Sequence, residues 1–136
     1  MNTVDQLKIK YPGALSWSFG DSPALANELA DLVKKGIKTA SCGSLASYLR
    51  EESAPKIGSY HIILNGQKAA VCVIRMVSMR LTRFCDITAG FARKEGEGDL
   101  SLAYWKKEHQ AFFSREGSYA PDMELVTEEF ELIEVL

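Results

Sequence analysis

The stretch YHIILNGQKAAVCVIRMVS, residues 60–78, carries the strongest indication of how this chain folds. Its two halves, 60–64 and 69–78, are rich in β-branched and other apolar side chains, which is the composition of strands. Between them lies Asn65-Gly66-Gln67-Lys68, and an Asn-Gly pair between two such runs is a signal for a hairpin turn. The stretch therefore predicts two paired strands in the middle of the chain.

Helical patterns lie on both sides of this hairpin. The clearest begins at Pro23, after the capping residues Asp21 and Ser22, and ends at Gly36. Further helices are expected over 3–11, 44–52, 86–95 and 99–116, and extended segments over 15–19 and 124–136, the last as one or two strands. Strands in the middle and at the end, with helices between them, predict an α+β fold: an antiparallel sheet or small barrel with helices around one core.

The size and composition fit a single domain over residues 1–136. A chain of 136 residues with 46% hydrophobic and 25% charged residues is ordinary for a globular protein. The longest apolar runs, such as 69–74, are too short to span a bilayer, so no membrane partner is expected. Residues 1–5 have no basic start and no apolar core. We therefore expect no secretion signal and a cytoplasmic location.

The cysteines give no sign of a metal centre. Cys42, Cys72 and Cys85 form no CxxC pair, and His61 and His109 show no ligand spacing to them. We therefore expect reduced structural thiols, no metal and no cofactor. The sequence leaves open whether Cys42 is reactive.

Charge is segregated along the chain. The formal net charge is −2, but residues 121–136 hold six acids and no base. Residues 1–120 then hold 16 bases against 12 acids, a formal +4. This excess is too small for extended duplex binding, which needs many phosphate contacts. It is compatible with a short single strand or a nucleotide.

Lys38, Thr39 and Ser41 follow the helix that begins at Pro23. A lysine just beyond a helix end can point into a cleft, and here two hydroxyls lie within three residues of it. A serine is a poor nucleophile without a base, and lysine acts as one only when burial lowers its pKa. The alternative is a solvated lysine beside two capping hydroxyls, which spacing alone favours.

Arg75 interrupts a strand whose two faces both read as apolar. A guanidinium in such surroundings needs a partner, either an acid of the chain or a bound phosphate. Glu95 and Glu97 flank Gly96 and are followed by Gly98. Two carboxylates at a glycine-rich corner suit acid–base chemistry or the anchoring of Lys38, whereas the simpler interpretation is a solvated loop.

Aromatic residues offer a further option. Trp17 can stack a base, although packing explains it equally well. His109, Trp105, Phe112 and Phe113 share one helical stripe and are interpreted as core residues, with His109 hydrogen-bonded.

Several of these segments, in this order, resemble the ASCH domain family of the PUA-like superfamily, small β-barrels associated with RNA. They span about residues 15–133 and comprise 18–29, 36–41, 71–75, 95–105 and 109–116. The family's Gly-x-Lys-x-x-Thr motif is matched by Gly36 and Lys38, with Ser41 in the place of threonine. The resemblance implies a PUA-like small mixed β-barrel of five or six strands, covered on one side by helices.

The resemblance also implies a function. We expect RNA or modified-nucleoside binding in a polar cleft lined by Lys38, Ser41, Arg75 and Glu95. Further contacts are expected from Glu97, Thr39 and Trp17.

Two alternatives stay open. Some small family members resemble amidohydrolases acting on acetylated cytidine, which would make Lys38, Ser41 and Glu95 catalytic, with Glu97 as the other possible carboxylate; ribonuclease activity is also associated with the family. The other alternative is a protein-interaction adaptor that uses the acidic C-terminal stretch. It predicts an exposed apolar patch and no closed polar pocket. The substrate, the RNA sequence preference and the oligomeric state are not determined by the sequence.

Overall fold

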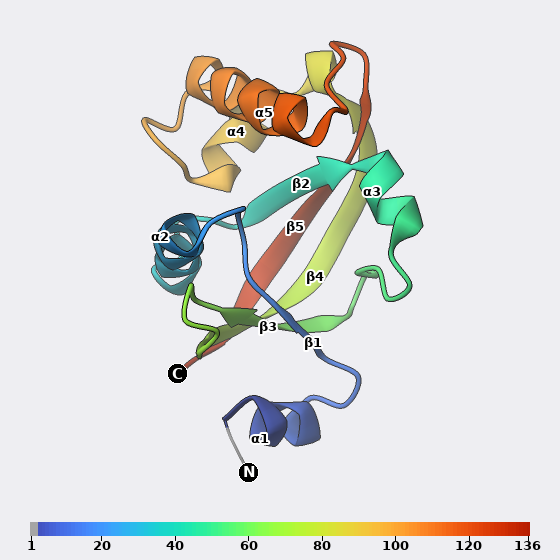
Figure 1. The fold of residues 1–136 in the computed structure, drawn as a ribbon. Helices are drawn as coiled ribbons and strands as arrows, with labels where there is room; N and C mark the ends of the chain where they lie inside the picture. Colours follow the sequence, from blue (N-terminus) through green and yellow to red (C-terminus); the bar gives the residue numbers. More distant parts are fainter. Residues whose placement is uncertain (1–2) are drawn as a thin grey trace.

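The computed structural model describes residues 3–136 (Figure 1). Met1 and Asn2 lie outside the described residues; they belong to the expected domain and to the N-terminal segment that shows no secretion signal. The helices are α1 Thr3–Lys10, α2 Pro23–Lys34, α3 Leu45–Arg50, the 3₁₀-helix η1 Phe84–Asp86, α4 Ala89–Glu95 and α5 Leu102–Glu116. The strands are β1 Leu15–Trp17, β2 Ala40–Ser44, β3 Tyr60–Leu64, β4 Ala70–Arg83 and β5 Glu124–Val135. The predicted α+β class is confirmed.

The five strands form one mixed sheet in the order β1-β3-β4-β5-β2. β1 runs parallel to β3, and the other three pairs are antiparallel. The register between β4 and β5 shifts at Val73/Ile74 and at Met76/Ser78. Such irregularities bend and twist strands, and Figure 1 shows the sheet curled into a half-barrel, as predicted.

The predicted hairpin is present between β3 and β4, closed by a hydrogen bond from Asn65 N to Ala69 O of 2.9 Å. Beyond it, β4 continues to Arg83, five residues further than expected. β5 is one unbroken strand and pairs with β4 along nearly all of this length. The long pairing sustains an extended conformation over residues whose own composition did not indicate it.

Side-chain caps set where the later helices begin. Thr88 Oγ1 accepts a hydrogen bond from Phe91 N at 3.1 Å, and Ser101 Oγ accepts one from Tyr104 N at 3.0 Å. α4 and α5 consequently begin three residues later than the predicted 86 and 99. Residues 40–43, for which no strand was predicted, and Ser44, expected as the start of a helix, form the edge strand β2.

The core has two principal parts. α2 packs against β3, β4 and β5 through a cluster that includes Leu29, Val33, Ile63, Ile74 and Phe130. α5 packs near η1 and the start of β5 through a second cluster that includes Phe84, Trp105, Phe113 and Leu125. In Figure 1, α4 and α5 lie over one end of the sheet and α2 lies beside it.

A third, smaller cluster joins α1 to the other face of the sheet through Leu7, Ile62 and Val73. No helix in residues 3–136 is long and apolar enough to cross a lipid bilayer.

Candidate functional site

The backbone around Lys38 is held tightly against the end of α4. After α2 the chain turns at Gly36, whose φ is +76°, and Thr39 N donates a hydrogen bond to Lys94 O at 2.8 Å. Gly96 has a φ of +75°, and a Cβ there would lie 2.7 Å from Ile37 O. Glycine at position 96 therefore permits both the left-handed end of α4 and its close approach to the chain that carries Lys38.

Lys38 is buried, with 2% of its surface exposed, so the solvated interpretation is wrong. Its Nζ donates to Glu95 Oε1 at 3.1 Å, to the backbone oxygen of Glu95 at 3.3 Å and to Glu97 Oε2 at 3.1 Å. It also lies 5.4 Å from the centre of the Phe19 ring. All three donors of the ammonium thus have acceptors, and both glycine-flanking carboxylates serve as partners.

Glu95 is the centre of a larger buried network, with 1% of its surface exposed. While Oε1 faces Lys38, Oε2 accepts a hydrogen bond from Trp105 Nε1 at 2.7 Å. His109 Nε2 lies 3.2 Å from the same oxygen, and Cys42 Sγ donates to it at 3.4 Å. Three elements, β2, α4 and α5, are joined through this one carboxylate.

Electrostatics fix the charges of this network. Burial disfavours the carboxylate, but Lys38 and then His109 outweigh it and hold the pKa of Glu95 well below its usual range. Burial likewise disfavours the ammonium, but Glu95 and Glu97 outweigh it and raise the pKa of Lys38. The raised pKa favours the charged form of Lys38, whereas a general base, the role that the hydrolase hypothesis gives it, needs the neutral amine.

The partners of His109 favour its protonated form. Its Nδ1 faces Trp105 O at 2.9 Å, and its Nε2 faces Glu95. Both partners are acceptors, and only a protonated imidazole has two N–H groups to offer. Burial opposes this charge, but the hydrogen bond to Glu95 and its negative charge raise the pKa of His109. Two cations, Lys38 and His109, then balance the two anions Glu95 and Glu97.

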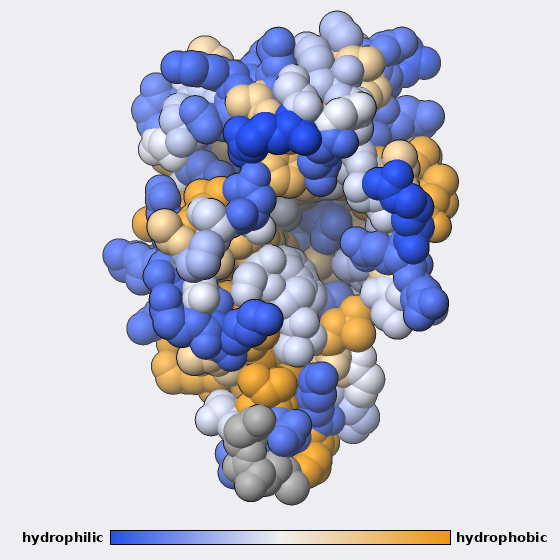
Figure 2. All heavy atoms as spheres, in the orientation of Figure 1, coloured by the Kyte–Doolittle hydropathy of each residue, from blue (hydrophilic) through white to orange (hydrophobic). Residues whose placement is uncertain are grey.

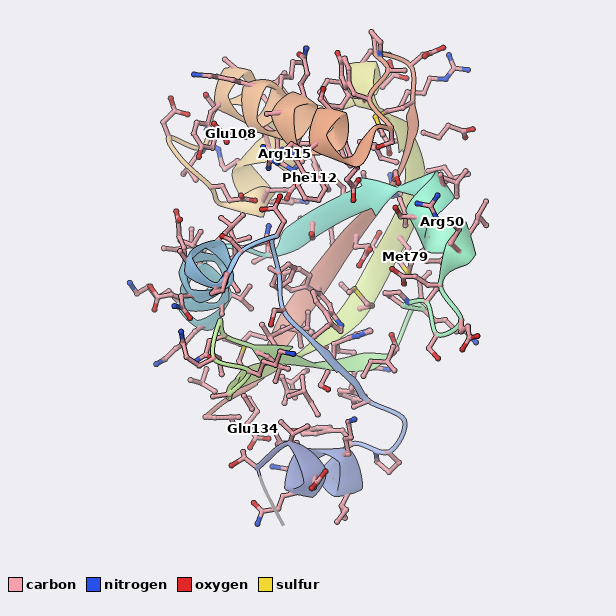
Figure 3. The ribbon with its side chains drawn as sticks, viewed as in Figure 1. Arg50, Met79, Glu108, Phe112, Arg115 and Glu134 are labelled. Carbon is pink, nitrogen blue, oxygen red and sulfur yellow. The ribbon has the colours of Figure 1, made fainter. Side chains whose placement is uncertain are left out.

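Two cavities meet at this network. The smaller, about 150 Å³, is lined by Lys38, Glu95, Glu97 and His109 together with residues of α2 and α5. Figure 3 shows Glu108, Phe112 and Arg115 on the side of α5 that faces α2, and all three line this cavity. The larger, about 710 Å³, lies between β1, β2, β5, α3 and the segment after α3. Figure 2 shows the surface hollowed between α5, β1 and α3.

Ser41 and Cys42 line both cavities, so β2 is their shared wall. The structure shows no hydrogen bond from the Ser41 hydroxyl to any group of residues 3–136, and this hydroxyl is free to contact a ligand. Burial, and then Glu95, raises the pKa of Cys42 well above its ordinary value. This shift favours the neutral thiol of Cys42 over the nucleophilic thiolate.

The other predicted site residues lie further away. Thr39 Oγ1 points to Lys94 O at 3.5 Å, and Thr39 lines neither cavity. Trp17 lines the larger cavity, and its Nε1 donates to His61 Nδ1 at 2.9 Å.

Arg75 is exposed and separate from the cleft, so the prediction that it lines the cleft does not match the structure. Its Nε donates to Gly58 O at 3.3 Å, and its guanidinium lies 5.4 Å from the Tyr60 ring centre. Alternation along β4 places Arg75 on the face of Val73, opposite Cys72 and Ile74. That face is only partly covered, so the buried surroundings inferred from the sequence were wrong.

Cys42, Glu95 and His109 could also hold a metal ion, since their donor atoms lie within 4.8 Å of one another. These residue types are ligands that zinc uses. Hydrogen bonds already occupy the three groups, however, and the Lys38 ammonium beside Glu95 opposes a further cation. The absence of a metal stays a prediction.

Sequence reasoning missed two members of the cleft. Trp105 is a core residue, as predicted, and its indole also donates to Glu95. His109, four residues further on the same face of α5, was interpreted as a core residue but lines the smaller cavity. Glu128 lines the larger cavity and was counted only as part of an acidic tail. Its alternation with Val126 and Phe130 was the signal that it faces inward.

Comparison with known proteins gives one family. The model of the ASCH domain matches residues 15–134. A solved ASCH domain from Lactobacillus crispatus JV V101 is 33% identical, with a TM-score of 0.85 over 95% of this chain and 85% of that one. A solved protein from Enterococcus faecalis V583 is 36% identical, with a TM-score of 0.82 over 98% and 88%.

A third structure, ASCH from Zymomonas mobilis, shares the fold at 10% identity, with a TM-score of 0.54 over 90% of this chain and 71% of that one. No curated protein matches the chain.

Proposed function

This chain belongs to the ASCH domain family, and we propose that it binds a nucleoside or a short segment of RNA in the cleft formed by the two cavities. The buried Lys38–Glu95 pair is the observation that carries the proposal, because it lines the smaller cavity beside Ser41 and Cys42, the residues that line both cavities. The association of the family with RNA gives the ligand class.

The pair is expensive to maintain for stability alone. Removing two charges from water costs several kcal/mol each, and apolar residues of similar volume often replace a buried pair without loss. A charged group that is buried, perturbed and lining a cavity is a candidate for function. Here Lys38 and Glu95 are such groups, and His109, whose pKa is raised, lines the same cavity.

In the proposed complex, Lys38 and His109 favour the ionised form of Glu95, and Lys38 also donates to Glu97. Glu97 is the more accessible of the two, with 22% of its side chain exposed against 2% for Glu95. It is therefore the carboxylate that we assign to the amine of a base. The Ser41 hydroxyl, at the junction of the cavities, adds a contact that can donate or accept.

An amidohydrolase of the acetylated-cytidine type is the second candidate, and the unbonded Ser41 hydroxyl favours it. In this version Ser41 or a water attacks the amide carbonyl, its proton passes to Glu95 or Glu97 and from there to the amine, which leaves as the C–N bond breaks. Lys38, as a cation, stabilises the negative charge that develops on the oxygen. Ribonuclease activity at the same residues is a variant of this hypothesis. The adaptor is disfavoured because it predicts no enclosed polar pocket.

The test compares Lys38→Met with Lys94→Met. Lys94 is a matched control because it also pairs with a glutamate, Glu129 at 2.8 Å, but on the surface. Each protein is mixed with acetylated cytidine and, separately, with short single-stranded RNA. Binding or turnover lost only in Lys38→Met supports the proposal, whereas equal behaviour of the two variants contradicts it. Turnover of acetylated cytidine, rather than binding alone, selects the hydrolase. The cytoplasmic location stays a prediction.

A further inference from the structure

The larger cavity is lined by acidic residues and by no basic residue of the described chain, which is unusual for a protein proposed to bind RNA. Three carboxyl groups, those of Glu51, Glu52 and Glu128, are among the residues that line it. No lysine, arginine or histidine of the described chain is among them. Its remaining polar lining consists of hydroxyl and backbone groups, and Trp17 contributes an aromatic side chain.

Glu128 is the carboxyl best placed to contact a ligand there. It lies directly opposite Ser41 in the antiparallel pairing of β2 with β5. Side chains directly opposite one another are roughly 5 Å apart at Cβ, so the carboxyl and the free hydroxyl of Ser41 are neighbours on one wall.

Glu128 has no hydrogen bond or ion pair with any group of residues 3–136. The next residue, Glu129, faces away from this cavity and is paired with Lys94 at 2.8 Å. An unpaired, largely buried carboxyl is costly, and a ligand that donates a hydrogen bond to it would remove that cost.

The surroundings of Glu128 are mostly negative. Burial, and then Glu51 and Glu95, raises its pKa to about 7, while Lys38 opposes the shift. Glu52 and the neutral side chains of Ser41, Cys42 and Tyr48 also line the cavity. A phosphate brought into this space would meet repulsion from three carboxyls, and no cation of the described residues is among the lining to offset it.

We propose that Glu128 determines which ligand the larger cavity accepts: its carboxyl accepts hydrogen bonds from the N–H groups of a nucleobase or a similar amine-bearing ring, and ligand phosphates are excluded. The inference rests on the proposed function and narrows it. A nucleoside enters whole, and an RNA segment enters with a base while its backbone stays outside.

The test is calorimetric titration of cytidine and of cytidine 5′-monophosphate into the full chain at pH 6 and pH 8. The unchanged protein is expected to bind cytidine about tenfold more tightly than the monophosphate at pH 8. Cytidine affinity is expected to rise from pH 6 to pH 8, because the carboxylate form of Glu128 is the stronger acceptor.

Glu128→Gln is expected to weaken cytidine binding about tenfold at pH 8 and to remove most of the pH dependence. Glu129→Gln, a substitution on the same strand outside the cavity, is expected to leave both unchanged. Thermal melting of each variant checks that it is folded, and Glu128→Asp, which keeps the charge on a shorter side chain, is expected to retain part of the pH dependence.

Three results would overturn the inference: preference for the monophosphate, cytidine binding that is the same in Glu128→Gln, or no cytidine binding at either pH. The proposed function and this inference can fail independently of each other. If RNA binding or acetylated-cytidine turnover depends on Lys38 while cytidine binding ignores Glu128, the function stands and the inference is wrong. If cytidine binding depends on Glu128 and nothing depends on Lys38, the inference stands and the role of the Lys38–Glu95 pair is wrong.

Discussion

Substituting Glu95 by Gln is the most direct perturbation of the buried network. The amide has nearly the shape of the carboxylate, but one of its ends carries two N–H donors. In one orientation these donors face Lys38 Nζ, 3.1 Å from the original oxygen. In the other they face Trp105 Nε1, which lies 2.7 Å from the original oxygen, and His109 beside it. Neither orientation satisfies the site, because donors confront donors in both.

The expected loss of stability is large. Removing one partner of a buried ion pair costs about 3–5 kcal/mol, because the other charge is left uncompensated. For a chain of this size, that corresponds to a fall in melting temperature of roughly 10–15 °C. The control is Glu129→Gln, which breaks the exposed pair with Lys94 and is expected to cost less than about 1 kcal/mol.

The unfolding free energy of both variants is measured by urea unfolding at pH 7, with far-UV circular dichroism as the signal. A loss in Glu95→Gln no greater than in the control would refute the reasoning. A second arm replaces the pair by Lys38→Met with Glu95→Leu. This double variant is expected to recover only part of the stability lost by Glu95→Gln: the Lys38 and Glu95 charges are both gone, but His109 and Trp105 Nε1 still lose their acceptor.

The stability difference between the unchanged protein and Glu95→Gln depends on pH in a definite direction. The folded state holds the pKa of Glu95 below its ordinary value of 4.5, so the carboxylate contributes stability above about that pH. The contribution is lost as pH falls through the lower, folded-state pKa. We therefore expect the gap between the unchanged protein and Glu95→Gln to narrow in acid, measured by the same unfolding curves at pH 7, 5 and 3.

Three further predictions address the surroundings of the cleft. Gly96→Ala is expected to cost about 2–3 kcal/mol of unfolding free energy in urea, because its Cβ would lie 2.7 Å from Ile37 O. Gly36→Ala, with a similar φ but open space, should cost only about 1 kcal/mol, and equal losses would contradict the steric argument. Glu128→Gln is expected to be more stable than the unchanged protein at pH 8, by about 2 kcal/mol, and not at pH 5. Folding raises the pKa of Glu128 from its ordinary 4.5 to about 7, so the ionised carboxylate destabilises the folded state at pH 8. Equal urea midpoints for the two proteins at pH 8 would contradict this prediction. Finally, a thiol-reactive dye should label exposed Cys85 quickly and label buried Cys72 and half-buried Cys42 slowly, because the pKa of each of these two thiols is raised. Fast labelling should therefore disappear in Cys85→Ser, and fast labelling of Cys42 would show that its thiol is not suppressed.

Local patterns in the sequence were sufficient for much of the architecture. The Asn65-Gly66 turn predicted the β3–β4 hairpin, and the caps and Gly36 predicted α2, because these signals act within a few residues. The family motif placed Lys38 and Ser41 near the cleft. The edge strand β2 and the last five residues of β4 were missed, since their extended conformation depends on pairing with β5, about 45 to 90 residues away.

The site divides in the same way. The sequence by itself determined that a lysine, a serine and two glutamates flank tight turns, and that an acidic segment ends the chain. Only the tertiary structure decided that Lys38 is buried, that Arg75 faces the opposite side of the sheet and that Glu128 stands across from Ser41. The physical reason is that burial and charge pairing are set by which distant segments meet. A lysine has the same spacing to its neighbours in solvent as between two carboxylates, but only the folded chain brings those carboxylates to it.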